Sequence, residues 1–279
     1  MNPTAQRRRV LLGLIGHPIG HSAAPAMHEA AGDALGLRVL YQLLDIAAAG
    51  PDRLRQVLDG VRAFGFAGVN VTFPYKEAVL PLLDRLSAPA RDVAAVNTVV
   101  VRNGQLIGHN TDTTGFGRAL MQELHGEVPG PVALLGAGGM GRAAGFALRA
   151  CRVAVRVFDT DPAKAARLAG DLGGEACASV AEAMADAAGV VNASPIGMLP
   201  NRDSPVPEAL LHDGLWVADA VYHPLVTPLL AAARRVGART LTGRSLSIHQ
   251  ALDAFALFSG EEAEEGVVAA AFDAVVGRA

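Results

Sequence analysis

The chain has 279 residues, of which 51% are hydrophobic and 18% are charged. This length exceeds one ordinary α/β core and suits two domains, and the composition is typical of a globular protein with buried parallel sheet. A formal net charge of −3 excludes electrostatic recruitment of nucleic acid or of an anionic membrane. Because no apolar run is long enough to span a bilayer, we expect a cytoplasmic protein without membrane contact.

Cysteine and histidine usage argues against disulfides and metals. Cys151 and Cys177 are too few for a disulfide framework or a cysteine metal site. The eight histidines are not paired with carboxylates at ligand spacing, so we expect no bound metal. The basic run at 7–9 precedes an apolar stretch too short for a signal peptide, which favours a disordered tail before the first strand.

The first part of the chain alternates short apolar runs with helical patterns, as βαβ units do. The expected strands are Val10–Ile15, Val39–Leu44, Gly68–Val71 and Asn97–Val101, and the expected helices are Pro25–Gly36, Pro51–Phe64 and Lys76–Leu86. Asn103-Gly104 then predicts a two-residue hairpin turn between apolar runs.

A second series of units follows a helix predicted over Thr114–Leu124. The expected strands are Val132–Leu135, Val153–Phe158, Gly189–Asn192, Trp216–Asp219 and Arg239–Leu241. A helix is expected after each strand, which is typical of a doubly wound parallel sheet. Two helices, from Ser247 to Phe258 and from about Glu261 to Val276, end the chain.

A glycine-rich loop follows the first strand of this second series. In GAGGMG, Gly136, Gly138 and Gly141 occupy the three glycine positions of the dinucleotide-binding fingerprint. The first permits a tight turn, the second brings backbone close to a pyrophosphate, and the third lets a helix pack on the strand. A merely structural glycine turn is the alternative, but the strand before the loop and the helix after it favour cofactor binding. Ala137, Gly139 and Met140 complete the predicted loop.

An acidic residue ends the next strand. Asp159 lies 23 residues after Gly136, where a carboxylate hydrogen-bonds the adenosine ribose of NAD. A 2′-phosphate would meet like charge there, so NAD is the expected cofactor, although Arg142 and Lys164 leave NADP possible. The alternative role for Asp159 is to cap the following helix, for which Asp161 is better placed.

These elements predict an α/β protein of two domains. Residues 1–113 and 246–279 would form an α/β substrate domain, to which the C-terminal helices return. Residues 114–245 would form a Rossmann nucleotide domain on a doubly wound parallel sheet.

Five polar side chains interrupt the apolar runs before the glycine loop. They are Asn70, Thr72 and Lys76 in GVNVTFPYK, Asn97 in AAVNTVVV and Asp112 in GHNTDTTGFG. The valines around these polar groups favour strands. Polar groups in such a strand reduce stability unless they are paired or functional. A lysine and an aspartate among amide and hydroxyl donors suit the reversible oxidation of a secondary alcohol. The chain is therefore predicted to be a dehydrogenase, with a structural Lys76–Asp112 salt bridge as the alternative.

Seven ordered motifs resemble those of shikimate dehydrogenases: GHPIGHSAAPAMHEA, GVNVTFPYK, AVNTVV, GHNTDTTGFG, GAGGMG, VNASPIGM and IHQALDAF. The resemblance covers about Leu11 to Phe258 and is greater to the quinate/shikimate dehydrogenase branch. It implies hydride transfer between NAD and the C3 hydroxyl or keto group of quinate or shikimate. The expected partner is then a small-molecule substrate, and the expected assembly is a monomer or a homodimer.

The resemblance also implies residue roles. Lys76 and Asp112 would be the catalytic pair, the lysine exchanging the alcohol proton and the aspartate orienting it. The implied substrate residues are Ser22, Thr72, Asn97, Tyr222 and Gln250, with Asn70 better suited to ordering its loop. Beyond the glycine loop and Asp159, the implied cofactor residues are Asn192, Ala193, Ser194 and Gly243.

Departures from the family pattern bear on specificity. Ala24 replaces the second serine of a carboxylate-binding HSxSP motif, which removes a hydrogen bond and leaves space for the C1 hydroxyl of quinate. An NADP-dependent biosynthetic shikimate dehydrogenase, or a relative acting on an aminated ring acid, is an alternative. A non-catalytic nucleotide-sensing domain is another, against which the retention of both Lys76 and Asp112 argues.

Overall fold

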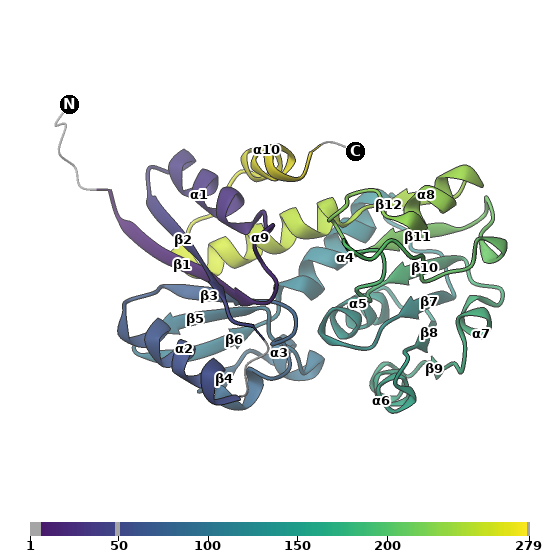
Figure 1. Cartoon of the computed structure of the whole chain (residues 1–279), viewed down its shortest axis with the longest axis horizontal. Coiled ribbons are helices and arrows are strands. Elements are labelled where there is room, and N and C mark those ends of the chain that lie inside the picture. Colours follow the sequence, from purple (N-terminus) through teal and green to yellow (C-terminus); the bar gives the residue numbers. More distant parts are fainter. Residues whose placement is uncertain (1–6, 48–50, 278–279) are drawn as a thin grey trace. The chain divides into compact units, whose positions relative to one another are not determined.

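The computed structural model describes residues 7–47 and 51–277; residues 1–6 of the predicted basic tail lie outside this part. One compact unit ends at Thr111 and includes Gln250–Val275, and the other contains Asp112–His249. Within the described residues, each unit is built on a six-stranded sheet (Figure 1). The expected α/β class with two sheets is confirmed, whereas substrate binding by one unit and nucleotide binding by the other stay predictions.

The sheet of the first unit is mixed, with the strand order β2-β1-β3-β5-β6-β4. Its strands are β1 (Arg9–Gly16), β2 (Arg38–Asp45), β3 (Gly68–Val71), β4 (Arg85–Leu86), β5 (Thr98–Arg102) and β6 (Gln105–His109). β1 runs parallel to β2 and β3, whereas β5 runs antiparallel to β3 and β6. The predicted hairpin is confirmed, because Asn103 and Gly104 have φ values of 51° and 74°, as a type I′ turn requires.

The helices of this unit are α1 (Ala24–Ala34), α2 (Pro51–Ala63), α3 (Ala88–Val93), α10 (Glu265–Val276) and the second half of α9 (Gly243–Ser259). The helix predicted over Lys76–Leu86 is wrong. That segment forms a turn, the 3-10 helix η1 (Leu80–Leu82) and strand β4, which pairs with β6. Pro81 lacks the amide hydrogen that an α-helix needs, and pairing with β6 supplies the backbone partners instead.

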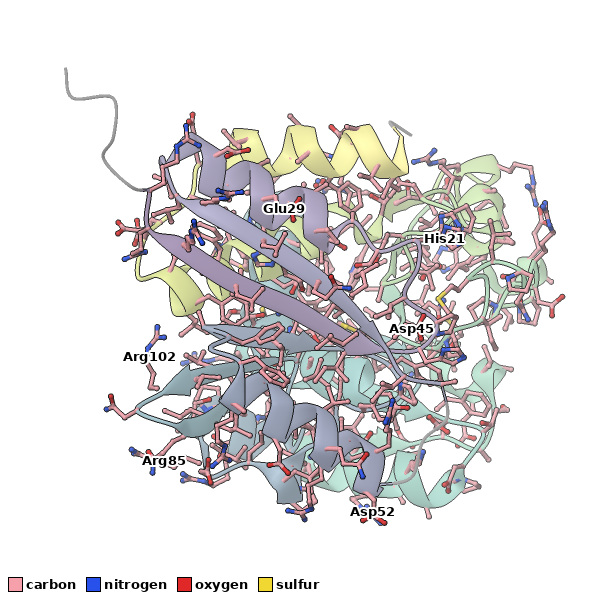
Figure 2. The ribbon with its side chains drawn as sticks, turned by 60° about the vertical axis from the view of Figure 1, so that its left-hand side comes forward. His21, Glu29, Asp45, Asp52, Arg85 and Arg102 are labelled. Carbon is pink, nitrogen blue, oxygen red and sulfur yellow. The ribbon has the colours of Figure 1, made fainter. Side chains whose placement is uncertain are left out.

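β2 lies at an edge of this sheet, where backbone donors could pair with another chain. Glu29 projects from α1 toward this edge (Figure 2), and its carboxylate accepts the backbone N–H of Tyr41 at 3.0 Å. The backbone N–H of Tyr41, in the middle of this edge strand, is therefore already hydrogen-bonded.

Aromatic residues of α9 pack on the same unit around a buried histidine. His28 of α1 stacks on Tyr41 with 4.9 Å between ring centroids, and the rings of Phe255 and Phe258 lie 6.1 and 5.9 Å away. The ring of Phe258 fills the space beside Gly68, where a Cβ would overlap it. His28 is 1% exposed, and among the described residues neither of its ring nitrogens has a hydrogen-bond partner.

Acid should destabilise the protein through His28. Burial lowers the pKa of His28 from 6.5 to about 3, so between these values the unfolded chain holds a proton that the folded chain lacks. This group alone then lowers the free energy of unfolding by up to about 1.4 kcal/mol for each pH unit below about 6.5. Urea unfolding from about pH 7 to about pH 4 should show a shallower loss of stability for His28→Leu than for the wild type. Equal pH slopes in the two proteins would contradict the burial of a neutral histidine.

The sheet of the second unit is parallel throughout, with the strand order β12-β11-β10-β7-β8-β9. Its strands are β7 (Val132–Leu135), β8 (Val155–Phe158), β9 (Glu175–Ala176), β10 (Gly189–Asn192), β11 (Trp216–Asp219) and β12 (Arg239–Leu241). The chain leaves β7 toward β8 and later returns to β10 on the other side of β7. Ligands bind doubly wound sheets at such a reversal, beyond the carboxyl ends of the strands.

The helices of this unit are α4 (Thr111–Glu123), α5 (Gly139–Ala150), α6 (Pro162–Leu172), α7 (Val180–Met184), α8 (Pro228–Arg235) and the first half of α9. The expected helix after every strand is wrong for β10, because the fully described segment up to β11 contains only the 3-10 helix η2 (Glu208–Leu210). Four prolines, at 195, 200, 205 and 207, interrupt that segment. None of the described helices combines the length and hydropathy needed to cross a bilayer.

Candidate functional site

The glycine loop connects β7 to α5 with a geometry that only glycine permits. Gly136 has a φ of +102°, and a Cβ there would lie 3.0 Å from backbone atoms of Ala193. A Cβ at Gly141 would overlap the carbonyl oxygen of Gly136. The turn and the start of α5 are therefore packed as closely as the backbone allows.

The amino end of α5 fits an anionic group. Gly138 is its N-cap, and among the described residues no side chain accepts from the first-turn amides. In α6 and α8, by contrast, Asp161 and Thr227 take this role. Free amides at the positive end of a helix dipole suit the pyrophosphate of a dinucleotide, so the residues present fit the predicted cofactor.

Asp159 lies beside this loop at the carboxyl end of β8. Its Oδ2 accepts the backbone N–H of Ala137 at 2.7 Å, and its Oδ1 accepts that of Asp161 at 2.8 Å. Asp161 caps α6 by accepting from Ala163 N at 3.0 Å and Lys164 N at 3.3 Å. The capping role considered for Asp159 therefore belongs to Asp161, and Asp159 keeps its carboxylate at the glycine loop.

Asn192, Ala193 and Ser194 form the loop at the end of β10. Asn192 is 0% exposed, and its Oδ1 accepts from the backbone N of Ser194 at 3.0 Å and from its Oγ at 2.6 Å. Its Nδ2 donates to the carbonyl of Ile196 at 3.0 Å. Ala193 N donates to the carbonyl of Leu135 at 2.8 Å. These three predicted cofactor residues therefore lie against the end of β7 and the glycine loop.

The structure adds Asp219, which the sequence analysis did not select. This side chain is 2% exposed and accepts from Asn192 Nδ2 at 2.9 Å, Thr227 Oγ1 at 2.7 Å and Val221 N at 3.0 Å. Burial raises its pKa to about 7, against the opposing effect of these three hydrogen bonds. In the sequence, Asp219 could have been selected because it is a charged residue at the end of the apolar run Trp216–Asp219.

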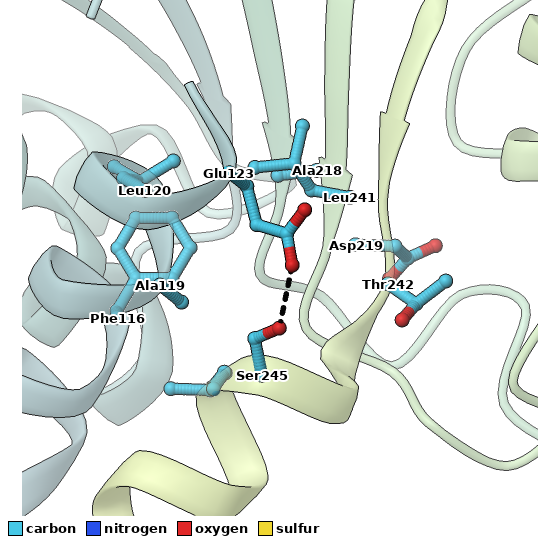
Figure 3. Close-up of a pocket in the computed structure, with 10 residues that line it drawn as sticks. Phe116, Ala119, Leu120, Glu123, Ala218, Asp219, Leu241, Thr242 and Ser245 are labelled. Atoms are coloured by element: carbon cyan, nitrogen blue, oxygen red, sulfur yellow. Dashed lines mark hydrogen bonds between the residues drawn. The ribbon is translucent and has the colours of Figure 1, made fainter. Parts of the chain in front are cut away.

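A small cavity of about 10 Å³ lies beside Asp219. Figure 3 shows its walls, which come from α4, β11, β12 and the start of α9, and the hydrogen bond from Ser245 Oγ to Glu123 at 2.8 Å. A Cβ at Gly243 would lie 2.8 Å from the carbonyl of Ala220, so α9 begins in close contact with the end of β11. The cavity admits about one water molecule and is too small for a ring acid.

Asn70 and Asn97, both predicted near the substrate, belong to a buried network of the first unit. Asn70 accepts from Tyr41 Oη at 2.8 Å and donates to Thr98 Oγ1 at 3.1 Å. Asn97 donates to Thr111 Oγ1 at 2.9 Å and accepts from Thr111 N at 2.7 Å. These bonds join β3 to the start of β5 and to Thr111, where α4 begins; the roles of Asn70 and Asn97 toward a loop or a substrate stay predictions.

Ser22, Thr72 and Lys76 follow neighbouring strands of the same sheet. Thr72 comes directly after β3 and Lys76 lies in the next turn, and both side chains are half-buried. The backbone N–H of His17, after β1, donates to the carbonyl of Phe73 at 3.0 Å. Ser22, on the loop that His17 begins, accepts from Ala24 N at 3.2 Å at the start of α1. The two loops therefore contact each other at the carboxyl edge of the sheet.

The remaining predicted residues divide between the units. Gln250 is half-buried on α9 and belongs to the first unit, as Lys76 does. Asp112, in the first turn of α4, is 6% exposed and belongs to the second unit together with the half-buried Tyr222. Their roles toward a substrate stay predictions.

Comparison with known proteins covers nearly the whole chain. The family described as "Shikimate dehydrogenase substrate binding domain" matches residues 14–99. The chain is 46% identical over 266 residues to the quinate/shikimate dehydrogenase (NAD(+)) of Corynebacterium efficiens, covering 91% of this chain and 94% of that protein. It is 43% identical over 265 residues to the shikimate dehydrogenase (NADP(+)) of Streptomyces avermitilis, covering 90% and 91% of the two chains.

Solved structures give the same result. The quinate dehydrogenase from Corynebacterium glutamicum in complex with NAD matches with a TM-score of 0.87 and 40% identity, covering 96% of this chain and 100% of that one. The shikimate 5-dehydrogenase from Thermus thermophilus in complex with NADP(H) and shikimate matches with a TM-score of 0.85 and 37% identity, covering 95% and 99%. The resemblance expected from the seven motifs is confirmed, and the chain belongs to the shikimate dehydrogenase family.

Proposed function

We propose that this protein is an NAD-dependent oxidoreductase that transfers hydride between the cofactor and the C3 hydroxyl or keto group of quinate or shikimate. The names of the relatives from both Corynebacterium species support this reaction. The observation that carries the choice of cofactor is the carboxylate of Asp159, held at 2.7 Å from the amide of Ala137 in the glycine loop. Its negative charge favours ribose hydroxyls and repels a 2′-phosphate.

Lys76 and Asp112 are the proposed acid–base pair. A bound nicotinamide would supply the hydride acceptor for the oxidation at C3 and the hydride donor for the reduction. In the oxidation, Nζ of an uncharged Lys76 takes the proton of the C3 hydroxyl as the C3–H bond breaks, and the C–O bond becomes a carbonyl. In the reduction, the same ammonium returns the proton to the oxygen. Asp112 orients the lysine and the hydroxyl through its carboxylate.

The proposed contacts to the ring acid come from side chains at the carboxyl edge of the first sheet, from the loop after β11 and from α9. They are Ser22, Thr72, Asn97, Tyr222 and Gln250, with Asn70 ordering the loop after β3. Ala24, buried at the start of α1, offers no hydroxyl to the ring carboxylate. This leaves room for the additional C1 hydroxyl of quinate, which supports activity on quinate as well as shikimate. A monomer or homodimer in the cytoplasm completes the proposal.

Initial rates on quinate and shikimate, each measured with NAD and with NADP, test this function. The proposal requires a higher kcat/KM with NAD than with NADP, and measurable turnover of quinate. Turnover of shikimate alone with NADP would instead support the biosynthetic NADP-dependent enzyme, and binding of nucleotide without turnover would support a sensor.

Cofactor preference should change with the residues after β8. In Asp159→Ser combined with Thr160→Arg, the repelling carboxylate is removed and a guanidinium can bind the 2′-phosphate. We expect the ratio of kcat/KM for NADP to that for NAD to rise by about 100-fold or more, because several kcal/mol of charge interaction change sign. Thr160→Arg alone is the control, and it should shift the ratio much less because Asp159 stays. A wild type that prefers NADP would refute the role given to Asp159.

A further inference from the structure

Asp219 joins two loops of the second unit. Asn192 ends β10, Val221 and Thr227 lie in the loop after β11, and all three donate to the same carboxylate. Thr227 also accepts the backbone N–H of Leu230 at 3.3 Å at the start of α8, which fixes its hydroxyl. A carboxylate with three donors, itself almost fully buried, is held as a fixed acceptor.

This acceptor determines how the Asn192 side chain is oriented. The two ends of an amide have nearly the same shape, but only the nitrogen donates. An ionised Asp219 only accepts, so Nδ2 of Asn192 must face it. Oδ1 is thereby turned toward Ser194, where it accepts from both the backbone N and Oγ. In the reversed orientation, Oδ1 would face the carboxylate and Nδ2 would face the Ser194 amide, so that hydrogen bonds at both ends would be lost.

The loop that Asn192 orders lies directly against the glycine loop. Backbone atoms of Ala193 would lie 3.0 Å from a Cβ at Gly136, so a shift of this loop must displace the turn at Gly136 or open a gap beside it. We propose that Asp219 is a positioning residue of the dinucleotide site, which acts through Asn192 to hold residues 193–196 against the glycine loop. The inference rests on the proposed function only in taking NAD as the dinucleotide.

The charge on Asp219 then matters for cofactor binding. Burial raises the pKa of this carboxyl to about 7, so below that pH it gains a proton and its hydrogen bonds become neutral ones, which are about half as strong. Glu123 of α4 lines the same cavity, and Tyr222 and His223 follow in the loop after β11. The test therefore compares the wild type with a variant in which position 219 carries no charge.

The experiment measures the dissociation constant of NAD by calorimetry without substrate, for the wild type, Asp219→Asn and Val217→Ala. At about pH 8.5 we expect Asp219→Asn to bind NAD about 10-fold more weakly, because the three charge-assisted bonds to the carboxylate, the one from Asn192 among them, become neutral or are lost. Between about pH 8.5 and about pH 6 the wild-type dissociation constant should rise by a similar factor, whereas that of Asp219→Asn should stay constant. The KM for NAD should rise in this variant by a larger factor than kcat falls.

Val217→Ala is the matched control. Val217 is fully buried on the same strand and packs in the hydrophobic core of this unit, so its truncation lowers Tm without touching Asn192. Wild-type NAD affinity in this variant supports a specific role for Asp219, and a loss as large as that of Asp219→Asn overturns it. A wild-type dissociation constant that is independent of pH between about pH 8.5 and about pH 6, together with wild-type NAD affinity in Asp219→Asn, also overturns it. Binding of NADP but not NAD would contradict the proposed cofactor, and the same comparison with NADP would then decide the role of Asp219.

Discussion

Replacing Lys76 by methionine should lower kcat by about 10²- to 10⁴-fold, because a thioether cannot take the proton of the C3 hydroxyl. KM for the ring acid should change much less, since the other proposed substrate contacts remain. Stopped-flow or steady-state assays with saturating NAD and quinate, followed by NADH absorbance, measure both constants.

Lys76→Arg separates proton transfer from a structural salt bridge. Arginine keeps the positive charge and the hydrogen-bond donors but does not release its proton in this pH range. If Lys76 acts as acid and base, Lys76→Arg should be about as inactive as Lys76→Met. Activity restored by arginine would mean that a salt bridge to an acidic side chain is its role, and near-normal turnover of Lys76→Met would remove it from the mechanism.

Substitution of Gly141 by alanine should weaken NAD binding by about 100-fold or more. The new Cβ would overlap the carbonyl oxygen of Gly136, so α5 or the glycine turn must move, at a cost of about 3 kcal/mol. The open amides at the start of α5 would then no longer face the pyrophosphate. The dissociation constant for NAD measures the loss of cofactor binding, and the Tm of the variant measures the loss of stability.

Gly170→Ala is the matched control in the same unit. Gly170 lies in α6, and among the described residues no atom beyond the neighbouring backbone of α6 lies within 4 Å of the Cβ that alanine would add. Alanine also has the higher helix propensity, so this variant should be as stable as the wild type or more stable by up to about 1 kcal/mol. NAD affinity equal to the wild type in both glycine variants would argue against dinucleotide binding at this loop.

The sequence by itself determined the features that depend on neighbouring residues. Strands such as β10 and β11 could be predicted because buried parallel strands are short apolar runs. The hairpin at Asn103-Gly104 needs positive φ at two consecutive residues, which this pair adopts readily. The glycine loop could be predicted for the same reason, because its spacing encodes a turn, a close backbone approach and a helix start within six residues.

Only the tertiary structure decided features that depend on distant residues. The segment Lys76–Leu86 has apolar residues at helical spacing, but Pro81 and pairing with β6 make its end a strand. The capping question at Asp159 was decided by the amide of Ala137, 22 positions earlier in the chain. In the sequence, Asp219 is recognisable only as the polar end of a strand. Its partners Asn192 and Thr227 are separated from it by 27 and 8 positions. Periodicity records which side chains are apolar, whereas the partner of a buried polar group is set by which strands and loops the fold brings together.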